Sequence, residues 1–70
     1  MESVYKIIEI VGTSEQSWED AAKTALDTAV RTIRDIRIAE VDKLDIKVNP
    51  DGNLIFRAKL KVSFKYEELS

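Results

Sequence analysis

The chain has 70 residues, with 11 basic and 13 acidic side chains and a net charge of −2. A single domain of this size buries only about 60% of its unfolded surface, so a disulfide, a metal ion or partner subunits usually stabilise it. The absence of cysteine and histidine excludes disulfides, thiol chemistry, the usual zinc ligands and the commonest general base. Oxygen-bound cations and oligomerisation remain as stabilising devices.

The near-balanced charge gives no basis for binding nucleic acid or an anionic membrane surface. No apolar run approaches the ~20 residues that span a bilayer, and Met1-Glu2-Ser3 lacks the features of a signal peptide. We therefore expect a cytoplasmic protein with a single domain over residues 1–70. An enzyme is not expected, because no nucleophilic triad can form and no carboxylate pair stands out.

The first predicted strand covers residues 4–11, which are rich in β-branched and aromatic side chains. Both of its faces carry apolar residues, so it needs cover on both sides, and the second cover is expected from another subunit. Gly12-Thr13-Ser14 is predicted to end this strand. A cradle for an anion before a helix is the alternative role of this segment, although strand termination suffices to explain the glycine.

A helix is predicted to begin after Ser17, its N-cap, with Asp20 three residues on completing a capping box. Its apolar stripe is dominated by alanine, which lets the helix approach a sheet closely but buries little area per residue. The stripe consists of Trp18, Ala21, Ala22, Ala25, Leu26, Ala29 and Ile33. The single tryptophan, Trp18, is either a stacking platform for a ligand or, as we prefer, an anchor of the helix to the sheet or a neighbour.

From Ile36 the apolar period becomes two, which predicts a long strand with a bulge, a strong twist or burial on both faces near residues 40–42. Asn49-Pro50-Asp51-Gly52-Asn53 predicts a hairpin turn, and it lacks the ligand pattern of a calcium loop. The last strand has apolar side chains at alternate positions from Leu54 to Tyr66. The sequence thus predicts an α+β fold of order β-α-β-β, with the last strand central and antiparallel to both others.

The other face of the last strand is basic, with Arg57, Lys59, Lys61 and Lys65. A groove for phosphate or nucleic acid is one interpretation, and ion pairing across the strands is the other. The turn should place Asp45 opposite Arg57, and a bulge should bring Asp42 or Glu40 near Lys59 and Lys61. Because this face carries no aromatic side chain for base stacking, we prefer ion pairing to nucleic acid, while a small phosphate-bearing ligand stays open.

Several segments share the sequence pattern of a known protein family. These segments are Val4-Tyr5-Lys6, Ile8-Glu9-Ile10-Val11-Gly12-Thr13-Ser14, the alanine-rich helix, Glu40-Val41 and Leu60-Lys61-Val62-Ser63-Phe64. With the length and element order, they resemble the dodecin family over nearly the whole chain. The resemblance implies a three-stranded sheet wrapped around one helix, and a hollow homododecamer of 23 symmetry. It also implies storage and sequestration of a flavin, FMN or riboflavin, rather than catalysis, with coenzyme A as a further ligand of some members.

Of the four positions that the resemblance assigns to ligand binding, three are altered in this chain and one is retained. Ile38 stands where flavin-binding members carry the tryptophan that sandwiches the flavin ring, and Arg57 stands where they carry a glutamine. Asp45 is acidic where bacterial members often carry a basic residue. Lys65 retains the basic residue that the family associates with the ligand phosphate. We therefore expect the shell to be retained and flavin affinity to be weak or absent.

Three hypotheses follow from the sequence. The first is a dodecin-like storage shell with an altered flavin site. The second is a calcium-binding or purely structural shell, because relatives without the tryptophan are associated with calcium, although the sequence names no metal ligands. The third is an unrelated β-α-β-β interaction module.

Overall fold

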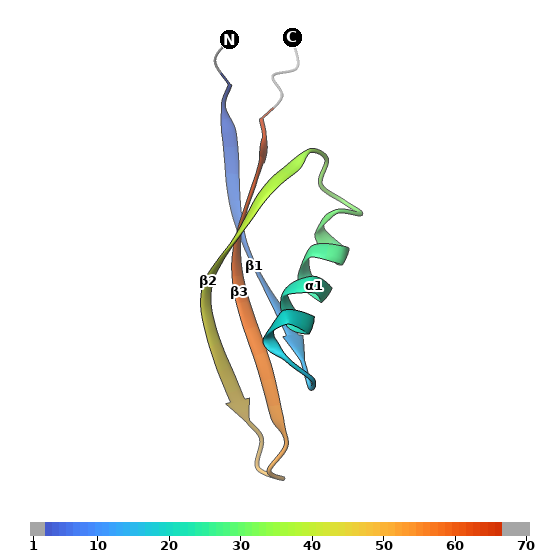
Figure 1. The fold of residues 1–70 in the computed structure, drawn as a ribbon, viewed down its shortest axis with the longest axis vertical. Coiled ribbons are helices and arrows are strands. Elements are labelled where there is room, and N and C mark those ends of the chain that lie inside the picture. Colours follow the sequence, from blue (N-terminus) through green and yellow to red (C-terminus); the bar gives the residue numbers. More distant parts are fainter. Residues whose placement is uncertain (1–2, 67–70) are drawn as a thin grey trace.

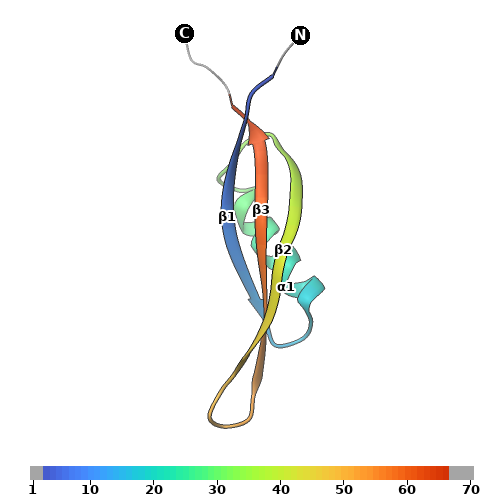
Figure 2. The same ribbon diagram turned by 90° about the vertical axis from the view of Figure 1, so that its left-hand side faces the viewer.

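The computed structural model describes residues 3–66, so Met1 and Glu2, used above in the signal-peptide prediction, lie outside the described residues. Its elements are β1 (Tyr5–Ser14), α1 (Trp18–Ala29), β2 (Ile36–Val48) and β3 (Leu54–Lys65). The strands form one antiparallel sheet in the order β1-β3-β2, and α1 covers one of its faces (Figures 1 and 2). The predicted α+β fold with a central last strand is therefore confirmed.

The first strand is longer than predicted, because Gly12-Thr13-Ser14 continues β1 and pairs with residues 56–58 of β3. The prediction that this segment ends the strand is wrong. The glycine serves helix packing instead: a Cβ at Gly12 would overlap the carbonyl oxygen of Ala21 and lie 2.9 Å from the Cβ of Ala25. Only a residue without a side chain lets α1 approach β1 so closely.

The helix begins where the sequence places it, since the Oγ of Ser17 accepts a hydrogen bond from the backbone N–H of Asp20 at 3.0 Å. The other half of the capping box differs. The carboxylate of Asp20 accepts a hydrogen bond from the Oγ of Ser14 at 2.6 Å, which ties the helix to the end of β1. The helix ends at Ala29, before Ile33, and the following turn places Asp35 in the left-handed region with φ 61°.

The long β2–β3 hairpin contains the predicted bulge, because the pairing register shifts between Val41 and Lys43. A second shift, which the sequence did not predict, lies between Ile36 and Ile38. The hairpin turn is also confirmed: the N–H of Gly52 donates to the carbonyl of Asn49 at 2.9 Å, and Gly52 has φ 91°.

The buried core is small. Among residues 3–66 it contains six hydrophobic residues, namely Ala21, Ala25, Ala29, Ala58, Leu60 and Val62. The chain is also elongated, at 53 × 20 × 16 Å, and its radius of gyration of 14.6 Å exceeds the roughly 11 Å of a compact chain of this length. The helix packs mainly on β1 and β3, so much apolar surface of the sheet stays exposed, as predicted.

We predict that Gly12→Ala destabilises the fold by about 2–3 kcal/mol, because the added methyl group must displace the backbone of α1. Gly52→Ala is the matched control: its Cβ meets nothing within 4 Å, so it should cost only the backbone strain, about 1 kcal/mol. Urea unfolding at equal protein concentration measures both. Equal losses of stability would contradict the close-packing role of Gly12.

Candidate ligand-binding face

The sheet has an outer face, defined here as the face turned away from α1. On β3 this face carries Arg57, Lys59, Lys61, Ser63 and Lys65, because the intervening residues Ala58, Leu60 and Val62 pack in the core with the helix. Directly opposite residues share a face in an antiparallel pair. Asp45 lies opposite Arg57, and Ile38 lies opposite Ser63. All four residues singled out from the sequence therefore lie on the outer face.

Asp45 and Arg57 form the ion pair that the hairpin register predicts. The guanidinium donates from Nε and from a terminal nitrogen to the two carboxylate oxygens of Asp45, each at 2.6 Å. The hydrogen bond from Arg57 lowers the pKa of the Asp45 carboxyl and, reciprocally, raises the pKa of Arg57. Both groups are thus charged at neutral pH, and these two N–H groups of Arg57 are already occupied.

A second group of charges surrounds Lys59. Its Nζ lies 2.9 Å from a carboxylate oxygen of Glu9 on β1 and 3.9 Å from one of Asp42 on β2. The hydrogen bond with Lys59 lowers the pKa of Glu9, and the same bond raises the pKa of Lys59. The contact with Asp42 was predicted from the bulge. The contact with Glu9 was missed, since it depends on the register between β1 and β3.

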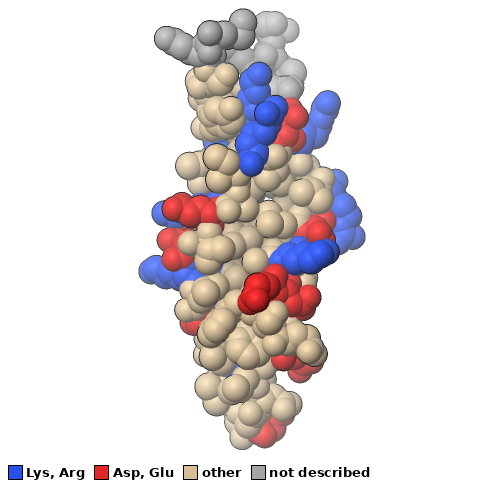
Figure 3. Space-filling model, in the orientation of Figure 1, with Lys and Arg blue, Asp and Glu red and all other residues tan. Residues whose placement is uncertain are grey.

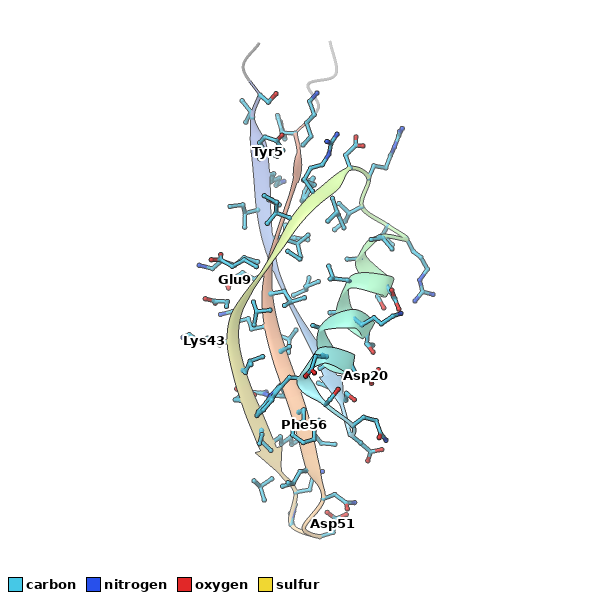
Figure 4. The ribbon with its side chains drawn as sticks, viewed as in Figure 1. Tyr5, Glu9, Asp20, Lys43, Asp51 and Phe56 are labelled. Carbon is cyan, nitrogen blue, oxygen red and sulfur yellow. The ribbon has the colours of Figure 1, made fainter. Side chains whose placement is uncertain are left out.

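A pocket of about 240 Å³ lies between these ion pairs and is lined by Val11, Lys43, Asp45, Arg57 and Lys59. All three strands contribute to it. Lys43 and Lys59 are directly opposite each other, and Figure 4 shows Lys43 and Glu9 on the side of the sheet away from the helix. The pocket is therefore a feature of the outer face with three cationic side chains in its lining.

Ile38 and Lys65 lie at the other end of the outer face. Ile38 is 65% exposed, and its carbonyl accepts a hydrogen bond from the Oγ of Ser63 at 3.4 Å. Ser63 lies six positions after Arg57 on β3, which is roughly 20 Å at the rise of a strand. One chain thus brings Asp45 and Arg57 together but does not place them beside Ile38 and Lys65.

Two aromatic residues, Tyr5 and Trp18, lie near the residues of this face. Tyr5 lies opposite Lys65, so the prediction that the basic face lacks aromatic side chains is wrong for the assembled sheet, where β1 supplies one. Trp18 behaves as the predicted anchor: its indole N–H donates to the carbonyl of Asp45 at 3.1 Å, and its ring meets Phe56 edge-on at 5.2 Å. The anchor fixes the backbone at Asp45, a link that no sequence pattern signals.

Within residues 3–66, no group of three or more acidic side chains is placed to hold a metal ion, and the helix of this range is too short to cross a membrane. The outer face offers instead fixed charges from three strands and an apolar end around Ile38.

The family model described as Dodecin matches residues 4–67 of the chain. A protein named calcium dodecin from Mycobacterium tuberculosis is 49% identical over 63 residues, which cover 90% of this chain and 89% of that protein. Its crystal structure, described as that of a calcium-chelating immunodominant antigen with a novel calcium-binding site, has a TM-score of 0.87, with 46% identity and 97% of each chain covered.

A dodecin from Thermus thermophilus is 37% identical over 68 residues, covering 97% of this chain and 99% of that one. The crystal structure of an arginine-to-alanine variant of it has a TM-score of 0.87, with 35% identity and coverage of 97% and 100%. These matches exclude the unrelated interaction module. Dodecins are non-enzymatic binding proteins, in agreement with the sequence prediction. The fold, the family model and the relatives lead to one conclusion: the chain belongs to the dodecin family.

Proposed function

We propose that this chain is the subunit of a homododecameric shell that stores a small ligand and binds flavin weakly or not at all. The observation that carries the proposal is Ile38, an exposed aliphatic side chain at the position where the family resemblance expects a stacking tryptophan. The assembly and the altered ligand preference have separate support and separate tests.

The support for assembly is the amount of apolar surface that one chain leaves uncovered. On the helix side of the sheet, the large exposed apolar residues of β2 and its hairpin are Val41, Leu44, Ile46, Val48 and Leu54. Figure 3 shows that the hairpin end is largely uncharged, with acidic atoms near the tip. Contiguous apolar surface of this kind marks contacts between proteins, and other copies of the chain would bury it.

We predict a particle of about 96 kDa in light scattering, which is twelve times the 8.0 kDa of one chain. Sedimentation velocity provides an independent measurement of the same mass. A species of one or two chains, near 8 or 16 kDa, would contradict the dodecameric shell.

The support for weak flavin binding comes from both ends of the outer face. Stacking on an aromatic side chain contributes about 1–3 kcal/mol per ring, and Ile38 cannot supply it. Two flavins stacked in one site would each lose this contribution. Arg57 could in principle donate to a ring carbonyl, but two of its N–H groups are bound to Asp45.

We predict little quenching of riboflavin or FMN fluorescence at micromolar wild-type protein. Ile38→Trp should restore the stack and tighten binding about 5- to 100-fold. Lys47→Trp is the control, since Lys47 is also an exposed residue on the outer face of β2 but lies near the hairpin turn. Strong quenching by the wild-type protein would refute the argument from Ile38.

Calcium is the second candidate ligand, and the observation that favours it is the 49% identity to a protein named calcium dodecin. Calcium binds six to eight oxygen ligands. The proposed site is one in which carboxylates of neighbouring subunits meet. A shell that binds no cation would be purely structural.

We predict that millimolar calcium raises the melting temperature of the shell and that excess chelator reverses the rise, because a ligand that binds only the folded protein stabilises it. Magnesium at the same concentration and ionic strength is the control. An unchanged melting temperature with calcium, or an equal rise with magnesium, would argue against a calcium site.

A further inference from the structure

We propose that the pocket lined by Lys43, Asp45, Arg57 and Lys59 binds a small oxyanion, such as the phosphate group of a ligand, and that Asp45 controls its access to Arg57. The inference rests on the proposed function, because it names the chemistry of a ligand that the shell would store. It concerns side chains of this chain that are on the outer face in the single subunit.

The charge of the pocket lining favours an anion. Lys43 and Lys59 are directly opposite each other, and like charges in such a pair repel. Glu9 and Asp42 offset the charge of Lys59. Within residues 3–66, Lys43 has no carboxylate oxygen within the 4.0 Å of an ion pair. An anion in the pocket would relieve the repulsion and supply the counter-charge of Lys43.

The size and polarity of the pocket also suit a small hydrophilic anion. A water molecule occupies about 30 Å³ in the liquid, so a volume of about 240 Å³ accommodates a phosphate group with part of its hydration shell. Val11 is the one apolar residue of the lining. Recognition there would rest on charge and hydrogen bonds, which fits a small hydrophilic anion better than a flat ring.

Asp45 and Arg57 have the geometry of a guanidinium that binds an oxyanion. The two parallel N–H···O bonds between them are the arrangement that a guanidinium also uses with phosphate. The Asp45 carboxylate therefore occupies the donors that an oxyanion would use. Exposed ion pairs are readily exchanged, and the backbone at Asp45 is held independently by Trp18. Its side chain can leave Arg57 without moving the strand.

The test is calorimetric titration of the assembled protein with inorganic phosphate at low ionic strength, where exposed charges are least screened. Asp45→Asn should bind phosphate at least about tenfold more tightly than wild type, because it frees Arg57 and removes a like charge. In that background, Lys43→Gln should weaken binding about fivefold or more. Lys47→Gln removes an exposed lysine of β2 outside the pocket and should have little effect.

Each variant is checked for the wild-type mass by light scattering before titration. No gain in affinity with Asp45→Asn would overturn the control by Asp45. Equal losses with Lys43→Gln and Lys47→Gln would overturn the site, because they would indicate attraction by overall charge. Failure of the proposed function shows itself elsewhere, in the mass and in the flavin titration of the wild-type protein, so the two failures are distinguishable.

Discussion

The close contact between α1 and β1 is the constraint on which the rest of the structure depends. At Gly12 the helix backbone comes so near the strand that a methyl group has no room, and the facing residues of the helix, Ala21 and Ala25, are equally small. This contact holds the helix over β1 and β3 and away from most of β2. At the same time it directs Trp18 across the sheet to the backbone of Asp45. The position of the helix thus determines which strands are covered, and it also determines that the backbone at Asp45 is held by Trp18.

The two faces of the sheet consequently differ in their chemistry: the helix side is apolar and the outer face is charged. The helix side has an alanine-rich core that is too small for the area of the sheet, so the apolar residues of β2 and the hairpin extend beyond it. The outer face is tied together by charge, through Glu9, Lys59 and Asp42 on three different strands. Apolar surface without a partner favours association with other copies, whereas exposed charged pairs contribute little to stability. We therefore assign the charged pairs to recognition.

What the sequence predicts well is what local geometry determines. The hairpin turn at residues 49–53 and one bulge set the register of β2 against β3, and from that register alone Asp45 was placed opposite Arg57. Contacts that depend on distant segments escaped prediction, such as Glu9 with Lys59, whose register is set by the packing of β1. Gly12 was misinterpreted for the same reason: a glycine at a strand end and a glycine beneath a helix look alike until the helix is placed. The apolar stripe extended to Ile33, whereas α1 ends at Ala29, because a stripe does not show that the N–H groups of Arg31 and Thr32 donate to carbonyls three residues back instead of four.

The distance between the two ends of the outer face bears on how ligand preference is encoded. Ile38 and the Asp45–Arg57 pair lie roughly 20 Å apart along the sheet, so neither residue change disturbs the packing of the other within one subunit. In the proposed function both changes act in one direction. Ile38 would withhold the stack that a planar ring requires, and Asp45 occupies two N–H donors of Arg57, while the cations around Lys43 remain. We propose that a subunit altered in this way keeps the surfaces that favour assembly and shifts the preference of its outer face from flat aromatic ligands towards small charged ones.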